Sequence, residues 1–171
     1  MNEKIDTIDI GTDFIDAIEL MFFAYRDFIA DPDAILSHHG FGRAHHRVLH
    51  FVANNRDISI AELLDILRIT KQSLARVLRD LIDAGYVQQK TGQQDRRQRL
   101  LRLTLRGHRL HQQLMAPQQQ RFRKIEQQIG TAAFNKWKKT MRLVINSEER
   151  NHVDRLIKKT TLDEMQNNKG R

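Results

Sequence analysis

Between Ser59 and Gly107 the sequence encodes two short amphipathic helices and a hairpin in succession, an order that few folds accommodate. Ser59 and Glu62 have the spacing of a capping box, in which the serine oxygen accepts a backbone amide and the glutamate reaches back to the cap. A first helix is therefore predicted to begin directly after Ser59. Its apolar side consists of Ala61, Leu63, Leu64 and Leu67.

A second helix is predicted to follow a short turn at 68–70. Thr70 is in the position of an N-cap, and the helix is expected to run from Lys71 to Ala84. Its apolar residues recur at three- and four-residue steps and should face the core: Leu74, Val77, Leu78 and Leu81. The other side carries donors suited to phosphates and base edges: Lys71, Gln72, Ser73, Arg76 and Arg79.

A hairpin with an arginine-rich tip completes this region. Gly85 is expected to end the second helix as a left-handed cap, and a strand is expected from Tyr86 to about Lys90. Asp95-Arg96-Arg97 stand at the tip, and Leu101 and Leu103 alternate with Arg102 along the returning strand. Two helices and such a hairpin can place one helix in a DNA major groove and the hairpin in the flanking minor groove.

The N-terminal segment has the period of an amphipathic helix. Its apolar stripe consists of Phe14, Ile18, Met21, Tyr25 and Phe28, widened by Ile15, Phe22 and Ile29. A stripe of this width needs a partner surface. Asp31 and Pro32 are expected to be the N-cap and first residue of a short new helix, which Gly40 and Gly42 interrupt. A further helix is expected from Arg43 to Ala53.

The sequence after the hairpin is also predicted to be helical. Thr104 should cap a long helix from Leu105, with a bend at Pro117, because proline removes one amide donor and crowds the preceding turn. Gly130-Thr131 separates this helix from a last helical region, whose inward residues are expected to be Phe134, Trp137, Met141, Val144 and Ile145. The polar tail after about Thr161 is expected to be frayed.

Composition excludes several classes of protein. The 171 residues, 40% of them hydrophobic, fit one compact domain or one domain with helical extensions. No run of about 18 apolar residues could span a bilayer, and the acidic segment from Met1 to Asp16 lacks the features of a secretory signal. We therefore expect a cytoplasmic protein without a membrane partner. The absence of cysteine excludes disulfides, thiol nucleophiles and thiolate zinc sites.

The net charge of +8 is concentrated in one part of the chain. Between Gln88 and Lys124 there are ten Lys or Arg residues and a single acidic residue, Asp95. Arginine dominates this window, and its planar fork of donors suits phosphates and base edges. The window indicates a polyanionic partner, although a basic face that is merely solvated would have the same composition.

In order and spacing, the segments Gly85-Tyr86-Val87, Asp95-Arg96-Arg97 and Leu103-Thr104-Leu105-Arg106-Gly107 resemble the winged helix-turn-helix of MarR-family bacterial transcriptional regulators. With the flanking helices, the resemblance covers roughly Asp13 to Ile157. It implies a mainly α fold with a small β-hairpin wing (α+β) and an obligate homodimer formed by the terminal helices. Residues 31–107 would be the DNA-binding lobe, 1–30 and 108–160 the dimerisation region, and 161–171 a disordered tail.

The resemblance also implies roles in binding a double-stranded DNA operator. The helix from Lys71 to Ala84 would be the recognition helix, and the candidate contacts in or beside it are Ser59, Thr70, Lys71, Gln72, Ser73, Arg76 and Arg79. Arg97 would enter the minor groove, oriented by Asp95, while Arg96 and Arg99 would contact the backbone. Gln98 and Gln93-Gln94 depart from the commonest wing pattern. Two-fold symmetry predicts a roughly palindromic operator with half-sites about one helical turn apart.

Members of the family commonly respond to small anionic or phenolic molecules, so the resemblance implies a ligand-responsive regulator, expected to be a repressor, that requires no cofactor. The candidate pocket residues combine aromatic walls with donors for an anion: Phe22, Tyr25, His39, Arg43, His46 and His50. An equally good account of these side chains is packing between the first helices and the dimer core.

Three other functions can be compared with the residues. The pairs His46 and His50, and His108 and His111, have spacings that permit zinc binding, although capping, core hydrogen bonds and a ligand pocket explain them more simply. An enzyme is not expected, because the sequence has no glycine-rich phosphate loop and no nucleophile elbow. A nonspecific architectural protein would explain the basic window as well as a sequence-specific regulator does.

Overall fold

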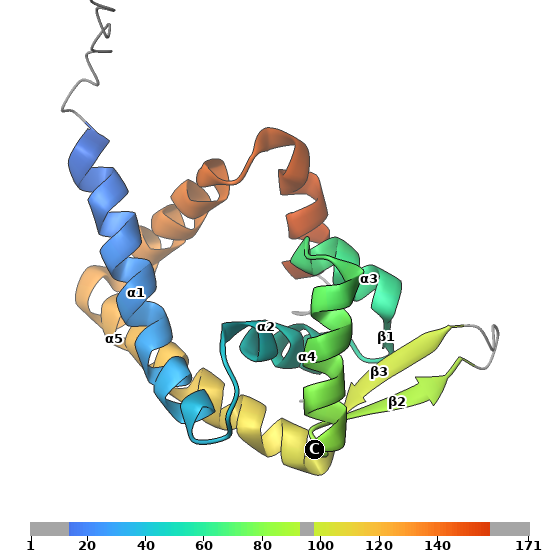
Figure 1. Cartoon of the computed structure of the whole chain (residues 1–171). Helices are drawn as coiled ribbons and strands as arrows, with labels where there is room; N and C mark the ends of the chain where they lie inside the picture. The colour runs from blue at the N-terminus through green and yellow to red at the C-terminus, as the bar shows by residue number, and fades with distance from the viewer. Residues whose placement is uncertain (1–13, 93–97, 158–171) are drawn as a thin grey trace, which may run out of the picture.

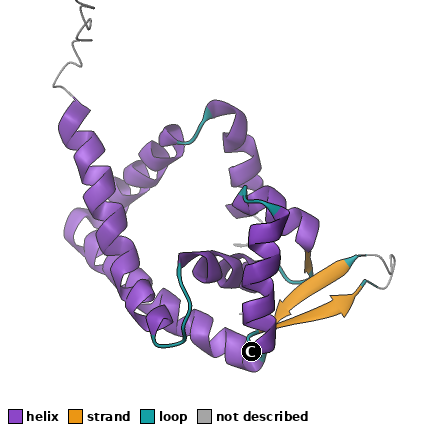
Figure 2. Ribbon diagram, in the orientation of Figure 1, coloured by secondary structure: helices purple, strands orange, loops and turns teal. Residues whose placement is uncertain are grey.

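The computed structural model describes residues 14–92 and 98–157, and it is mainly helical with one small antiparallel sheet (Figures 1 and 2). The elements in chain order are α1 (Ile15–Ser37), α2 (Arg43–Asn54), β1 (Ile58–Ser59), α3 (Ile60–Leu67), α4 (Lys71–Asp83), β2 (Val87–Thr91), β3 (Arg99–Leu103) and α5 (Leu105–Val144). A further helical segment covers 147–157. Helices α2, α3 and α4 and the sheet form one lobe, from which α1 and most of α5 extend side by side (Figure 1).

The predicted caps of the lobe are confirmed. The Ser59 hydroxyl accepts a hydrogen bond from the Glu62 backbone amide at 3.1 Å, and the Glu62 carboxylate accepts one from the Ser59 amide at 2.8 Å. Thr70 caps α4 and Thr104 caps α5, each accepting from the amide three residues on. Gly85 has a φ of +73°, the left-handed conformation expected of the residue that ends α4.

The predicted hairpin is the larger part of a sheet with the strand order β1-β3-β2. In its register Val87 pairs with Leu103 and Thr91 pairs with Arg99. The two-residue strand β1, which the sequence did not predict, pairs with the other edge of β3 through Ile58 and Leu101. The hairpin is therefore joined at its base to the start of α3.

The core lies between the lobe helices, the sheet and the first turns of α5. All four residues predicted to face inward from α4 are buried: Leu74, Val77, Leu78 and Leu81. Val48, Leu49 and Val52 of α2 are buried as predicted, and Leu110 and Leu114 of α5 join the same cluster. Side chains of this size each contribute roughly 1.5–3 kcal/mol when fully buried, so this cluster holds α4 against the lobe.

The prediction of a new helix at Pro32 is wrong, because α1 continues through Pro32 to Ser37. A proline inside a helix leaves the carbonyl oxygen four residues earlier without its donor. Here that oxygen belongs to Phe28, and the side-chain amide of Gln118 on α5 donates to it at 3.4 Å. Pro32 itself is buried. The contact with α5 thus allows α1 to pass through the proline without ending.

The predicted break between α5 and the last helical region at Gly130 is confirmed, whereas Pro117 lies inside α5 and the bend expected there stays a prediction. The backbone leaves helical geometry at Gly130, where φ is +80° and ψ is 155°. Beyond Gly130 the aromatic rings of Phe134 and Trp137 lie 5.3 Å apart. The expectation that this last region turns inward is met only in part, because Val144 is 61% exposed and Trp137 is 39% exposed. Within the described residues, no helix is long and apolar enough to cross a membrane.

Candidate nucleic-acid interface

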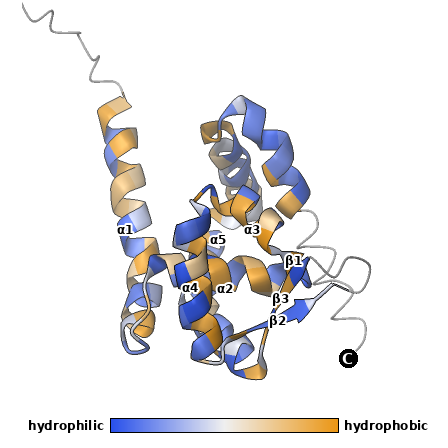
Figure 3. Cartoon of the chain, turned by 45° about the vertical axis from the view of Figure 1, so that its right-hand side comes forward, coloured by the Kyte–Doolittle hydropathy of each residue, from blue (hydrophilic) through white to orange (hydrophobic). Residues whose placement is uncertain are grey.

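Helix α4 presents a polar face to solvent, opposite its buried leucines and valine (Figure 3). The exposed residues include all five that the sequence singled out: Lys71, Gln72, Ser73, Arg76 and Arg79. Within the described residues, neither Arg76 nor Arg79 has an ion-pair partner. Their guanidinium groups therefore remain available for phosphates or base edges.

The hydroxyls of Ser59 and Thr70 are engaged in capping. Thr70 accepts from the Ser73 amide at 3.1 Å and donates to the Ser73 hydroxyl at 2.9 Å. Ser59 donates to the Glu62 carboxylate at 2.7 Å. These bonds begin α3 and α4 at defined residues, so the first contribution of both hydroxyls is to position the helices.

Two other contacts hold α4 at its C-terminal end and in its middle. The Arg106 guanidinium lies 4.4 Å from the centre of the Tyr86 ring and donates to the Ala84 carbonyl oxygen at 3.0 Å. His45 of α2 lies 3.2 Å from the Asp80 carboxylate. Arg106 belongs to the basic window, yet its side chain is used to satisfy a carbonyl at the end of α4.

The described part of the wing ends just below its tip. Arg99 donates to the Thr91 hydroxyl at 3.0 Å, and the Gly92 amide donates to the Gln98 carbonyl oxygen at 3.0 Å. The predicted minor-groove residue Arg97, the Asp95 expected to orient it and the Arg96 expected to contact the DNA backbone lie outside the described residues, as does the tail after Thr161. Arg99 is exposed, and it pairs with Thr91 at the end of the described strands.

An ion pair at the base of the wing was missed by the sequence analysis. Asp57 has a left-handed φ of 62°, and both of its carboxylate oxygens accept hydrogen bonds from Arg102 of β3. These bonds, together with the nearby charges of Arg56 and Lys90, hold the pKa of Asp57 below its usual value. Arg102 is therefore neutralised and joins the hairpin to the turn before β1. The two residues are 45 positions apart, so no local pattern could have revealed the pair.

Four of the six residues proposed for an effector pocket lie together around a cavity of about 390 Å³ between α1, α2 and α5: Tyr25, Arg43, His46 and His50. Phe28, Phe51 and Phe122 supply apolar walls, and Arg47 adds a second cation. Arg43 donates to the Asp33 carboxylate at 2.9 Å. The cavity thus combines aromatic surface with two guanidinium groups, of which that of Arg43 is ion-paired with Asp33 and that of Arg47 donates to the Leu67 carbonyl oxygen at 2.9 Å.

The other two proposed pocket residues lie elsewhere. Phe22 is 69% exposed on α1. The ring nitrogen Nδ1 of His39 is 3.1 Å from the Tyr86 hydroxyl, and its ring stacks on Phe41. Neither residue lines the cavity described above. Spacing along α1 did not distinguish Phe22 from Tyr25, because tertiary packing determines which of the two side chains lines the cavity.

Three histidines lie close to one another between α2 and α5. The rings of His50 and His111 are 5.7 Å apart, and His46 stands one turn before His50. Burial lowers the pKa of His46 and His50, and it lowers the pKa of His111 to about 4, with the neighbouring histidines adding to the effect. No group of three His, Asp or Glu side chains within 14–92 and 98–157 is arranged to hold a metal ion.

Comparisons with known proteins agree with this architecture. Residues 39–98 match the MarR family. The chain is 42% identical over 139 residues to PetP, an HTH-type transcriptional regulator of Rhodobacter capsulatus, and the match covers 81% of this chain and 84% of PetP. The structure of Streptococcus pneumoniae FabT in complex with DNA is similar with a TM-score of 0.69 at 16% identity, over 77% of this chain and 94% of FabT.

A second solved structure has the same fold. Staphylococcus aureus MarR in complex with salicylate and kanamycin is similar with a TM-score of 0.63 at 19% identity, over 75% of this chain and 87% of that protein. A winged helix-turn-helix with an exposed polar helix defines a class of DNA-binding proteins. The chain belongs to the MarR family. It is a DNA-binding transcriptional regulator and not an enzyme.

Proposed function

We propose that this protein represses transcription as a homodimer that binds a pseudo-palindromic operator and releases it when a small anionic or phenolic molecule binds. The observation that carries the DNA-binding part is the exposed face of α4, where Arg76 and Arg79 are without ion-pair partners among the described residues. Residues 31–107 would form the DNA-binding lobe, and 1–30 with 108–160 would form the dimerisation region.

The homodimer is supported by the apolar surface that this single chain leaves uncovered. Phe14 is 73% exposed at the start of α1, and Ile18, Phe22 and Phe23 are exposed along it. In Figure 3 much of the part of α1 that extends from the lobe is orange, the colour of hydrophobic residues. An apolar helix face of this length is unfavourable in water, and a second copy would cover it. Two copies related by a two-fold axis would present two α4 helices to a palindromic site.

Replacing Arg76 with alanine is expected to weaken operator binding by about 5- to 150-fold, because one arginine contact to a base contributes about 1–3 kcal/mol. Arg123→Ala on α5 removes the same charge from an exposed position beyond Pro117 and is expected to leave the affinity nearly unchanged, with gel filtration showing that both variants keep the oligomeric state of the wild type. The operator would be obtained by sequencing DNA that co-purifies with the protein, and affinities would be measured by fluorescence anisotropy at fixed salt.

Two results would contradict this assignment of α4. One is equal loss of affinity in Arg76→Ala and Arg123→Ala, which would indicate only a general effect of charge. The other is equal competition by the operator and by random DNA of the same length, which would favour the nonspecific architectural protein.

The proposed effector site is the cavity that contains Tyr25, Arg43 and His46. Salicylate, which is bound in the S. aureus MarR structure, serves as the probe. Arg43→Gln is expected to weaken salicylate binding by about 10- to 150-fold, because a charge-assisted hydrogen bond contributes roughly 1.5–3 kcal/mol. His39→Ala is the control, because His39 does not line the cavity. Equal salicylate affinity in the wild type and Arg43→Gln, measured by calorimetry, would exclude Arg43 from the site.

A further inference from the structure

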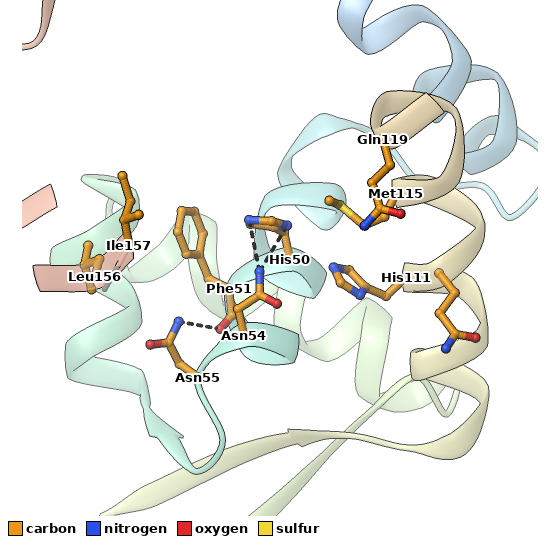
Figure 4. A pocket seen from close by; sticks show the side chains of 10 residues that line it. His50, Phe51, Asn54, Asn55, His111, Met115, Gln119, Leu156 and Ile157 are labelled. Atoms are coloured by element: carbon orange, nitrogen blue, oxygen red, sulfur yellow. Dashed lines mark hydrogen bonds between the residues drawn. The ribbon is translucent and has the colours of Figure 1, made fainter. Parts of the chain in front are cut away.

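A second cavity lies on the other side of His50, between α2, α5 and the helical segment 147–157. Its volume is about 400 Å³. Figure 4 shows the His111 side chain extending from α5 toward His50 and Asn54 on α2, with Leu156 and Ile157 at the opposite side of the space. His50, Phe51, Met115 and Gln119 line both this cavity and the one that contains Arg43. The two cavities are therefore neighbours that share one wall.

The chemistry of the second cavity differs from that of the first. Of the ten described residues that line it, none is Asp, Glu, Lys or Arg. The polar groups are carboxamides, including Asn54, Gln112 and Gln119, and the imidazoles of His50 and His111. Because burial lowers the pKa of His111 to about 4, its ring is uncharged at neutral pH. The first cavity, by contrast, contains Arg43 and Arg47.

The polar groups of the second cavity retain hydrogen-bonding capacity. The Asn54 amide nitrogen lies 3.2 Å from a ring nitrogen of His50, while its oxygen can still accept. The Nε2 atom of His111 is buried and has no hydrogen-bond partner among the described residues. Apolar surface from Phe51, Met115 and Ile157 separates these groups. A few convergent polar groups in a mainly apolar cavity of this volume are typical of small-molecule sites.

We propose that this cavity is a second ligand site, which takes an uncharged aromatic amide or a heteroaromatic molecule of similar size. A carboxylate would lose its hydration there without gaining a cation, which is unfavourable. A carboxamide could instead exchange hydrogen bonds with Gln112, Gln119 and Asn54 while its ring packs on Phe51. The proposal goes beyond the effector response proposed above and does not depend on it.

The test uses salicylamide and salicylate, which differ by the replacement of a carboxylate with a carboxamide. Binding would be followed at pH 7 by the NMR signals of the histidine rings in the full-length protein. Salicylamide is expected to shift the signals of His111 and His50. Gln112→Ala is expected to weaken salicylamide binding about fivefold, the effect of one lost hydrogen bond. Gln113→Ala is the matched control, because Gln113 is the next residue of α5 and lines a different hollow.

The proposal is overturned if salicylamide leaves the His111 signals unchanged, which includes the case in which a partner subunit fills the cavity. It is also overturned if Gln112→Ala and Gln113→Ala weaken binding equally. Salicylate binding is expected to be insensitive to Gln112→Ala and sensitive to Arg43→Gln. Failure of salicylate to bind at all would contradict the proposed effector response alone, while the salicylamide result would still decide the second site.

Discussion

Replacing Gly107 with alanine is expected to lower the free energy of unfolding by about 3 kcal/mol or more. A Cβ atom at this position would lie 2.0 Å from the Tyr86 carbonyl oxygen and 3.2 Å from the Leu103 Cβ. The Tyr86 oxygen also accepts hydrogen bonds from Thr104, at the cap of α5. Overpacking in a core costs roughly 1–3 kcal/mol, and a backbone atom cannot rotate away as a side chain can. Urea denaturation followed by circular dichroism measures the effect.

Gly42→Ala is the matched control for Gly107→Ala. Gly42 has an extended backbone with φ of −137°, and a Cβ there would have nothing within 4 Å. Its replacement is expected to change stability by less than about 1 kcal/mol. If the two variants unfolded at the same urea concentration, the close approach of α5 to Tyr86 would not determine the stability of the lobe.

Lowering the pH from about 6.5 to about 4 is expected to destabilise the protein through His111. In the folded state the pKa of this histidine is lowered from 6.5 to about 4, chiefly by burial. The unfolded state therefore binds a proton in this range that the folded state does not. Stability is therefore fully retained above the unfolded-state pKa of His111, and the free energy of unfolding decreases progressively as pH falls toward the folded-state pKa. It amounts to at most roughly 3 kcal/mol.

Two variants separate His111 from the other titrating groups. His111→Leu removes the buried imidazole, so the loss of stability between pH 6.5 and 4 should become smaller than in the wild type. Gln113→Ala replaces an exposed residue of the same helix that does not titrate, and should leave the pH dependence nearly unchanged. Denaturation at several pH values provides the comparison, and an unchanged slope in His111→Leu would show that other groups are responsible.

Local features of this protein could be predicted from the sequence because their partners lie within a few residues. Ser59 and Glu62 form the capping box, Thr70 caps α4, and Gly85 takes the left-handed conformation. The polar face of α4 follows from helical periodicity for the same reason. Its buried residues recur at three- and four-residue steps, and the exposed residues lie between them. The polar face was therefore identified from the residues of the helix, whereas its role as a recognition helix came from the resemblance to the family.

Features that depend on distant partners could not be predicted in this way. The periodicity of α1 grouped Phe22 with Tyr25, yet only Tyr25 lines the cavity, because the position of α5 determines where the cavity forms. Asp57 and Arg102 are 45 residues apart, and their ion pair depends on the pairing of β1 with β3. Arg106 was grouped with the other arginines by charge, although it satisfies a carbonyl at the end of α4.

The order of the lobe helices, their caps and the polar face of α4 follow from the local sequence, since each depends on interactions between residues three or four positions apart. The continuation of α1 through Pro32 depends instead on a distant contact, because the carbonyl oxygen of Phe28 receives a hydrogen bond from Gln118, 90 residues later. Tertiary packing also determines that His50 lines both cavities, whereas His46 lines only the first and His111 only the second. Contacts between α1, α2 and α5 arise when the chain folds, and no local pattern specifies them.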